Sequence, residues 1–138
     1  MKNNPLIVLT EDNAADVFLV RSALEDAGLA FRLHVISDGE QALRFLQTVE
    51  TDQSACPDVL LLDLNLPKMS GADILRSLRE NNHCSASSVV VLTSSDSPQD
   101  RARVAQLGVE HYFLKTASLD EFMKLGSIVR QVLEDREE

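Results

Sequence analysis

The sequence predicts an α/β fold in which helices cover both faces of a parallel, five-stranded sheet. Strand-like apolar runs and helix-like periods alternate five times along the 138 residues. This alternation is typical of βα units. The runs LIVLT, VLLL and VVVL are continuously apolar, as expected of strands buried on both faces. Together these patterns favour a three-layer α/β sandwich.

The first half of the chain supplies three strands and two helices. The strands are expected at residues 5–10, 31–36 and 58–62. The first helix is expected to begin at a cap, Asp12 or Asn13, and to end at Gly28, because glycine readily adopts the left-handed conformation that follows many helices. The second helix is expected from residue 37 or 38 to 49, and a polar loop leads from it to the third strand.

The second half supplies the remaining two strands, at residues 89–92 and 111–114. The helices are expected near 72–81, from 97 to 108 and from 118 onward. Ser97, Pro98 and Asp100 provide an N-cap, a first-turn proline and a first-turn acid, and Ser118 and Glu121 have capping-box spacing. Right-handed crossovers then predict a doubly wound, flavodoxin-like sandwich with strand order 2-1-3-4-5.

Composition predicts one soluble domain over residues 1–138, with a core over about 5–134. The formal charge of -9 argues against binding to nucleic acid or to an anionic membrane. A signal-peptide pattern and a membrane-spanning run are both missing, so a cytoplasmic location is expected. Cys56 and Cys84 share no CxxC spacing, and we expect reduced thiols at both positions.

Polar side chains follow four of the predicted strands at the point where each strand ends. Glu11 and Asp12 follow the first strand, Asp63 the third, Thr93 the fourth and Lys115 the fifth. In an open parallel sheet, ligands bind outside the carboxyl ends of the strands. Three carboxylates, a hydroxyl and an ammonium group should therefore meet at one edge of the sheet.

Such a group of side chains suits phosphoryl transfer to a carboxylate. At about 4 Å, two carboxylates repel each other by roughly 4 kcal/mol at an effective dielectric near 20, so the cluster needs a cation. Mg²⁺ prefers carboxylate and phosphoryl oxygens. Lys115 adds a positive charge, and Thr93 can donate a hydrogen bond to a transferred phosphoryl oxygen.

The chain resembles the receiver domains of two-component response regulators over nearly its whole length. The resemblance is carried by the acidic pair after the first strand, by the DxxxPxxxG stretch from Asp63 through Pro67 to Gly71, and by Thr93 and Lys115. It implies a domain that receives a phosphoryl group from a sensor histidine kinase and acts as a signal transducer, without rapid enzymatic turnover.

The resemblance also implies a role for each residue of the predicted site. Asp63 is the implied phosphoacceptor. Glu11, Asp12, Asp63 and the backbone carbonyl of Asn65 are the implied ligands of Mg²⁺. The phosphoryl donor is a histidine on another protein.

Three further residues are implied to respond to the phosphoryl group. Thr93 is the implied switch hydroxyl, Lys115 the phosphate partner, and Tyr112 an aromatic switch with inward and outward rotamers. The chain departs from the family at Thr116, where a proline after a cis peptide bond is usual. A non-proline cis bond costs roughly 3 kcal/mol, so a trans bond and a different loop are expected here.

The missing proline, with EDNAAD and DLNLPKMSG, resembles the single-domain regulators that are paired with bacterial phytochromes. Output is then expected through binding to other proteins. In the first predicted helix Phe18 points away from the apolar stripe, which suggests a docking contact for the kinase. An isolated exposed apolar residue is the competing interpretation.

The last predicted helix is apolar around more than one face. Its apolar residues are Leu119, Phe122, Met123, Leu125, Ile128, Val129, Val132 and Leu133. Such a helix is usually buried on two sides. We therefore expect a homodimer that uses this helix and neighbouring elements.

Other functions of this fold type fit less well. A flavin mononucleotide site needs a phosphate-binding loop after the first strand, where EDNAAD would repel phosphate. A haloacid dehalogenase type of hydrolase needs a second acid two residues after its nucleophile, where this chain has Asn65. The alternative that remains open is a degenerate receiver that acts as a phosphorylation-independent dimeric binding module.

Overall fold

Five parallel strands form one sheet in the order β2-β1-β3-β4-β5, which confirms the predicted topology. The computed structural model describes residues 4–53, 55–94, 97–115 and 118–136. The strands are β1 (Leu6–Thr10), β2 (Arg32–Ile36), β3 (Val59–Asp63), β4 (Ser88–Thr93) and β5 (His111–Leu114). All five carboxyl ends lie at the same edge of the sheet because every pairing is parallel.

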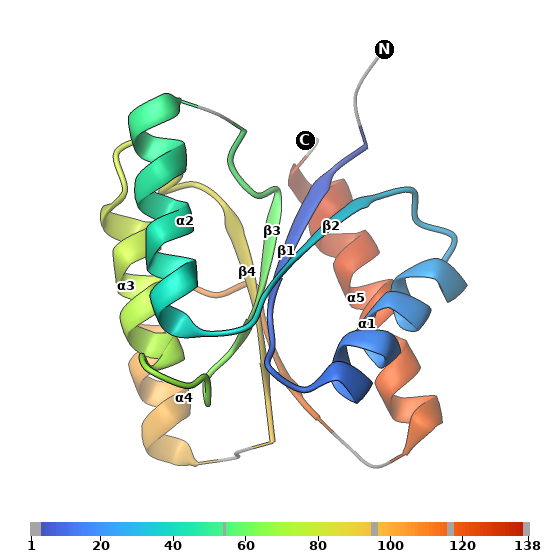
Figure 1. Ribbon diagram of the computed structural model, residues 1–138. Helices are drawn as coiled ribbons and strands as arrows, with labels where there is room; N and C mark the ends of the chain where they lie inside the picture. The colour runs from blue at the N-terminus through green and yellow to red at the C-terminus, as the bar shows by residue number, and fades with distance from the viewer. Residues whose placement is uncertain (1–3, 54, 95–96, 116–117, 137–138) are drawn as a thin grey trace.

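Five helices complete the three layers. They are α1 (Ala14–Asp26), α2 (Gly39–Asp52), α3 (Gly71–Glu80), α4 (Pro98–Ala105) and α5 (Leu119–Arg136). Helices α1 and α5 cover one face of the sheet, and α2, α3 and α4 cover the other (Figure 1). Each face has its own apolar core, and β3 and β4 are buried along their whole length because they lie between the two cores.

Local signals in the sequence set the helix ends. The side chains of Asn13, Asp38 and Ser97 cap α1, α2 and α4 by accepting hydrogen bonds from backbone N–H groups. Gly28 follows α1 with a φ of 77°, in the predicted left-handed conformation. Helix α2 extends three residues beyond the predicted end at residue 49, because Gln53 provides the left-handed C-cap.

The contact between α1 and α5 needs a glycine because the two backbones approach closely. A Cβ atom on Gly126 in α5 would lie 2.2 Å from the carbonyl oxygen of Ala23 in α1. The two helices can therefore pack tightly side by side. The apolar residues of α5 are partly used in this packing, since Phe122, Leu125 and Val129 are buried within the protomer. Leu119 remains 55% exposed.

Cys56 and Cys84 form a disulfide, so the prediction of two reduced thiols is wrong. The parallel register pairs Val59 of β3 with Ser88 of β4. Cys56 lies just before β3 and Cys84 just before β4, so this register brings two residues that are 28 positions apart to a Cα–Cα distance of 5.4 Å. Cysteines whose spacing differs from the CxxC pattern can therefore still form a disulfide when the fold brings them together.

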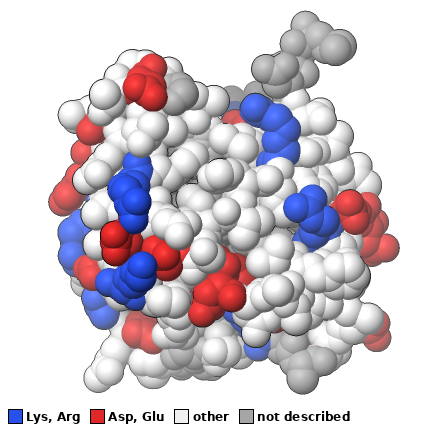
Figure 2. Space-filling view, in the orientation of Figure 1, with Lys and Arg blue, Asp and Glu red and all other residues white. Residues whose placement is uncertain are grey.

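None of the described helices is both long enough and apolar enough to span a bilayer. Acidic side chains are exposed in several places on the molecular surface (Figure 2). The space-filling view shows Asp and Glu side chains together in the region where β1 leads into α1 (Figure 2). This region is the carboxyl-terminal edge of the sheet.

Candidate functional site

Three predicted carboxylates meet at the carboxyl-terminal edge of the sheet. Glu11, Asp12 and Asp63, which we call the acid cluster, each place a carboxylate oxygen within 4.8 Å of the others. Glu11 is 2% exposed and Asp63 5% exposed, whereas Asp12 is exposed to solvent. The convergence follows from the fold, since β1 and β3 are neighbours at the point where the strand order reverses.

Lys115 reaches the acid cluster from the end of β5. Its Nζ donates hydrogen bonds to Glu11 Oε2 at 2.5 Å, to Asp16 Oδ2 at 2.9 Å and to Asp63 Oδ2 at 3.2 Å. One ammonium group thus contacts three carboxylates. Asp16 was not predicted as a site residue. It lies in the first turn of α1, and its position one turn beyond Asp12 is the signal that could have identified it.

Burial and charge shift the pKa values of this group. Burial raises the pKa of Glu11, the repulsion from Asp63 raises it further, and the hydrogen bond from Lys115 only partly compensates. Burial acts to lower the pKa of Lys115, but hydrogen bonds to Glu11 and Asp16 and the charge of Asp63 raise it above its ordinary value. At neutral pH Lys115 is therefore positively charged and bound to carboxylates.

Backbone and hydroxyl contacts fix the position of Asp63. Its N–H donates to Thr10 Oγ1 at 3.1 Å, and the Thr10 hydroxyl donates to the carbonyl of Leu61 at 3.4 Å. The N–H of Asn65 donates to Asp63 Oδ1 at 2.9 Å. A Cβ atom on Gly71 would lie 2.7 Å from the carbonyl oxygen of Asp63, which explains the glycine of the DxxxPxxxG stretch. Thr10 has no distinctive sequence signal because it reads as an ordinary strand residue.

Thr93 lies at the end of β4 and is fully buried. The side-chain amide of Asn65 donates to its Oγ1 at 3.4 Å. A cavity of about 200 Å³ adjoins this contact, with Asn65 and Ser70 on one side and Asp100 and Arg103 of α4 on the other. The peptide bond between Lys115 and Thr116, expected to be trans, lies outside the described residues.

Tyr112 lies on β5 and is partly buried against the core that α2, α3 and α4 cover. The guanidinium of Arg101, on α4, stacks 4.3 Å from the centre of its ring. Such a cation–π contact stabilises one rotamer of the tyrosine. Tyr112 is therefore linked to the same helix that borders the cavity beside Thr93.

Phe18 is 67% exposed on the outer side of α1, whose buried residues are Val20, Ala23 and Leu24. The prediction that its ring points away from the sheet is confirmed. Leu114, the last residue of β5, is 40% exposed. The ion pair between Asp16 and Lys115 links helix α1, which carries Phe18, to the end of β5, which carries Leu114.

The donor set of the acid cluster fits a hard divalent cation. Its oxygen atoms come from three carboxylates that lie close enough to share one ion, and Mg²⁺ is usually held by a few carboxylates that leave room for water and phosphate oxygens. Asn65 follows Asp63 by two residues, so its carbonyl is available at the same edge. The arrangement combines a buried carboxylate, a group of oxygen atoms that suits a divalent cation, and an ammonium group.

Comparison with known proteins gives a consistent result. Residues 7–126 match the response regulator receiver domain family. The response regulator Rcp1 of Synechocystis is 35% identical over 127 residues, which are 90% of this chain and 86% of Rcp1.

Two solved structures have the same fold over nearly their whole length. The Mn²⁺-bound form of Rcp1 has a TM-score of 0.83 and 35% identity, with coverage of 94% of this chain and 95% of Rcp1. The phosphorylated cyanobacterial phytochrome response regulator RcpA has a TM-score of 0.85 and 29% identity, with coverage of 97% and 96%.

Proposed function

Because the chain belongs to the response regulator receiver domain family, we propose that it accepts a phosphoryl group on Asp63 and signals by binding other proteins. The observation that carries this proposal is that one buried carboxylate, Asp63, has an oxygen within 4.8 Å of carboxylate oxygens of Glu11 and Asp12 and forms an ion pair with Lys115. Asp63 sits at the end of a strand that is buried throughout. The strands and helices between Leu6 and Arg136 form one sheet with its covering helices, which supports a single receiver domain over the chain.

In the proposed reaction, a carboxylate oxygen of Asp63 attacks the phosphorus atom of a phosphohistidine on a kinase. The bond to the imidazole nitrogen breaks as the bond to Asp63 forms, and the electron pair returns to the imidazole. Glu11, Asp12, Asp63 and the carbonyl of Asn65 would hold Mg²⁺, which supplies positive charge for the phosphoryl oxygens. Lys115 is positioned to exchange its contact with Asp63 for a phosphoryl oxygen.

The phosphoryl group would then draw Thr93 and Lys115 towards it, and β5 and α4 would respond. The packing of α4 supports this step. Val104 is the one buried residue of α4, a helix that is described along its whole length. Few buried contacts favour local movement. The cavity beside Asn65 and the stacking of Arg101 on Tyr112 connect this helix to the site.

Labelling with acetyl phosphate tests the proposed phosphoacceptor. Purified protein is incubated with and without Mg²⁺, and its intact mass is measured. We expect a Mg²⁺-dependent gain of one phosphoryl group in the wild type and in Asp26→Asn, which removes an exposed carboxylate at the end of α1. Asp63→Asn should gain none. Lack of labelling under every condition would contradict the proposal and favour the phosphorylation-independent binding module.

We infer that the protein is cytoplasmic, that its phosphoryl donor is a sensor histidine kinase, and that the kinase docks on the region that includes Phe18. Phe18 and Leu114 support this site because both are exposed and each is near in sequence to one residue of the Asp16–Lys115 ion pair. The likeness to RcpA, described as a phytochrome response regulator, supports a kinase of the phytochrome type.

Kinase docking can be separated from the chemistry at Asp63. Phe18→Ala should slow transfer from the kinase and leave acetyl phosphate labelling unchanged. Arg21→Ala, which alters another exposed position of α1, serves as the matched control. Equal transfer rates in Phe18→Ala and the wild type would place docking elsewhere.

We also propose a homodimer through α5 and neighbouring elements. Leu119 is exposed, and Ile128 with Val132 lines a groove of about 390 Å³ whose other residues include Glu110 and His111. Light scattering during size-exclusion chromatography should give a dimer for the wild type and a monomer for Ile128→Glu. A wild type that stays monomeric at high concentration, with and without acetyl phosphate, would contradict the dimer.

A further inference from the structure

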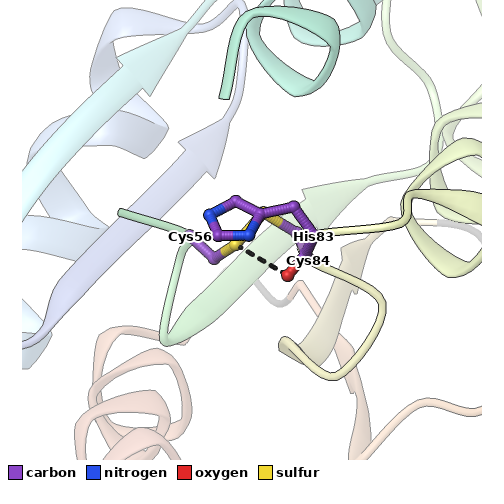
Figure 3. A group of neighbouring side chains, drawn as sticks. All are labelled: Cys56, His83 and Cys84. Atoms are coloured by element: carbon purple, nitrogen blue, oxygen red, sulfur yellow. Dashed lines mark hydrogen bonds between the residues drawn. A yellow bond between two sulfur atoms is a disulfide. The ribbon is translucent and has the colours of Figure 1, made fainter. Parts of the chain in front are cut away.

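The disulfide between Cys56 and Cys84 lies at the amino-terminal edge of the sheet, opposite the acid cluster. Cys56 is in the loop before β3, and Cys84 is in the loop before β4, next to His83 (Figure 3). The bond closes a ring that contains β3, with Asp63 at its end, and the whole of α3. The disulfide thus links the loop before β3, which ends at Asp63, to the loop before β4, which ends at Thr93.

The two loops are held together by contacts that do not need the disulfide. Ser87 Oγ donates to the carbonyl oxygen of Pro57 at 2.7 Å, and the N–H of Ser88 donates to the carbonyl of Asp58 at 3.3 Å. The β3–β4 pairing begins here, with Val59 opposite Ser88. A reduced pair of thiols would therefore remain close enough to form the bond again.

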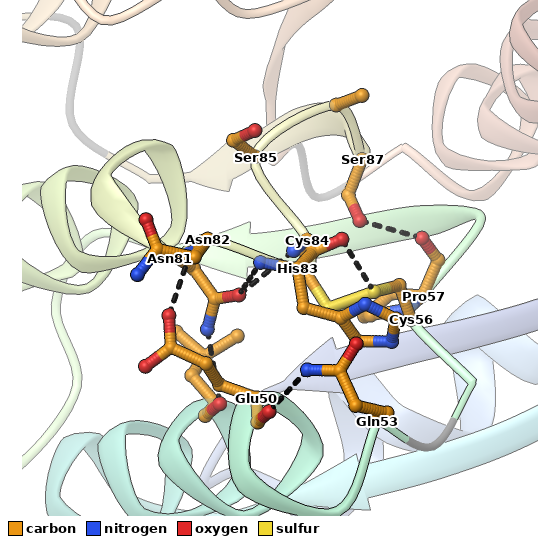
Figure 4. The surroundings of a disulfide bond; sticks show 12 residues. Glu50, Gln53, Cys56, Pro57, Asn81, Asn82, His83, Cys84, Ser85 and Ser87 are labelled. Carbon is orange, nitrogen blue, oxygen red and sulfur yellow. Dashed lines mark hydrogen bonds between the residues drawn. A yellow bond between two sulfur atoms is a disulfide. The ribbon is translucent and has the colours of Figure 1, made fainter.

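Asn81 holds the segment around Cys84 in place (Figure 4). Its Oδ1 accepts hydrogen bonds from the N–H groups of His83 at 2.8 Å and Cys84 at 2.7 Å, and its amide donates to the carbonyl of Leu46 at 3.0 Å. Cys84 is consequently fixed against α2 and only 1% exposed. Cys56 is partly exposed, so an external thiol meets the disulfide at Cys56.

His83 provides a ring nitrogen and a backbone carbonyl that can accept a proton or a hydrogen bond from the thiol of Cys56. A ring nitrogen of His83 lies within 4.8 Å of both sulfur atoms. The Sγ of Cys56 lies 3.3 Å from the backbone carbonyl of His83, a hydrogen-bond acceptor for the thiol of the reduced protein. An imidazole beside a thiol can accept the proton that the sulfur must lose before it attacks a disulfide.

We propose that Cys56 and Cys84 form a reversible redox site that exchanges with low-molecular-weight thiols and disulfides such as glutathione, and that exchange enters at Cys56. A thiolate attacks Cys56 Sγ, the protein disulfide breaks, and Cys84 leaves as a thiolate that takes up a proton. A second thiolate attacks the mixed disulfide and releases Cys56 with the oxidised small molecule. The net reaction converts two thiols and one protein disulfide into one small-molecule disulfide and two protein thiols.

Metal binding by the reduced pair is the competing interpretation. Cys56, His83 and Cys84 offer three donors, whereas a structural zinc site uses four protein ligands. Within the described part of the chain, no fourth histidine, cysteine or carboxylate joins this group. The geometry therefore favours thiol–disulfide exchange.

The first experiment measures exchange in the full chain. The reduced wild type is incubated with oxidised glutathione, quenched with acid and alkylated, and its intact mass and peptide masses are recorded. We expect an intramolecular disulfide, preceded by a mixed disulfide at Cys56. A protein that keeps two alkylatable thiols, or a mixed disulfide found only at Cys84, would overturn the proposal.

Single variants test the asymmetry between the two sulfur atoms. Cys84→Ser should form the glutathione adduct about tenfold faster than Cys56→Ser, because the remaining thiol of the latter is buried. Comparable rates in two folded variants would contradict entry at Cys56. If either variant fails to fold, the peptide map of the quenched wild type decides the same question.

Two further measurements separate the role of His83 from a structural one and test the metal alternative. His83→Gln should slow adduct formation and flatten its pH dependence without changing the melting temperature of the oxidised protein. An unchanged rate would remove His83 from the site.

One equivalent of Zn²⁺ added to the reduced protein should leave both thiols open to alkylation, and stoichiometric protection of the thiols from alkylation would favour a metal site instead.

Discussion

The two edges of the sheet are built on opposite principles. At the carboxyl-terminal edge, Lys115 contacts three carboxylates, and the acid cluster remains short of positive charge. At the amino-terminal edge, a disulfide, hydrogen bonds from Ser87 and Asn81, and hydrogen bonds from the guanidinium of Arg79 to the loop before β4 hold the loops together. We therefore expect charge repulsion to lower stability at the edge that carries the candidate site, and the disulfide to raise it at the opposite edge.

The charge balance explains why the first edge can respond to a ligand. Three carboxylates, from Glu11, Asp16 and Asp63, share the ammonium group of Lys115, and the carboxylate of Asp12 lies beside them. We expect a divalent cation or a phosphoryl group to change this balance directly, because each brings its own charge to these oxygens. At the amino-terminal edge the charged side chains have other partners, since Arg136 forms an ion pair with Asp58 and Arg79 donates to the backbone carbonyls of Ser85 and Ser87.

The largest expected effect on stability comes from the disulfide. The double variant Cys56→Ser/Cys84→Ser should lose about 3–4 kcal/mol of unfolding free energy, as expected for a closed loop of roughly this length. Urea unfolding, followed by circular dichroism, measures the loss. Reduction of the wild type should have nearly the same effect. Equal stability of the oxidised and reduced proteins would show that the amino-terminal edge does not depend on the bond.

The next effect concerns Lys115. Lys115→Met leaves partly buried carboxylates without their cation and should lower the unfolding free energy by about 2–3 kcal/mol in metal-free buffer. Mg²⁺ should restore part of the loss because it replaces the missing charge. Lys124→Met breaks an exposed ion pair with Glu121 and should cost less than about 1 kcal/mol. Similar losses in both variants would contradict a strained acid cluster.

Neutralising Asp63 should act in the opposite direction. Asp63→Asn removes repulsion from two neighbouring carboxylates and gives up one contact with Lys115. We expect the metal-free protein to gain about 1 kcal/mol of stability. The exposed control Asp26→Asn should change it by less than about 0.5 kcal/mol. A lower melting temperature in Asp63→Asn would mean that the three acids do not repel one another.

The smallest effect is a pH dependence that belongs to Glu11. Its pKa is raised in the folded protein above the ordinary value of 4.5, so the folded state binds this proton more tightly than the unfolded chain. The resulting stability is fully present below that ordinary value and is lost as pH rises through the raised pKa.

Comparison with Glu11→Gln isolates this contribution from the other carboxylates. In metal-free buffer, the stability of the wild type relative to Glu11→Gln should increase as pH falls from neutral towards 4.5. Parallel pH profiles of the two proteins would show that burial of Glu11 does not affect its titration.

The sequence predicts the carboxyl-terminal edge better than the other edge, and the reason is physical. Glu11, Asp63 and Lys115 each follow an apolar strand, so the topology alone brings them together. The topology alone does not predict the contact of Asp16 with Lys115, because this contact depends on how the first turn of α1 faces β5. The disulfide escapes it because the pairing depends on the β3–β4 register, which local patterns do not specify.

The position of the phosphoryl group tests the central claim most directly. After labelling with acetyl phosphate and Mg²⁺, reduction with borohydride converts an aspartyl phosphate to homoserine, and peptide mass spectrometry locates the converted residue. Our account predicts homoserine at position 63 alone. Conversion at Asp12 or Asp16, which lie close to Asp63, with Asp63 unmodified would contradict it.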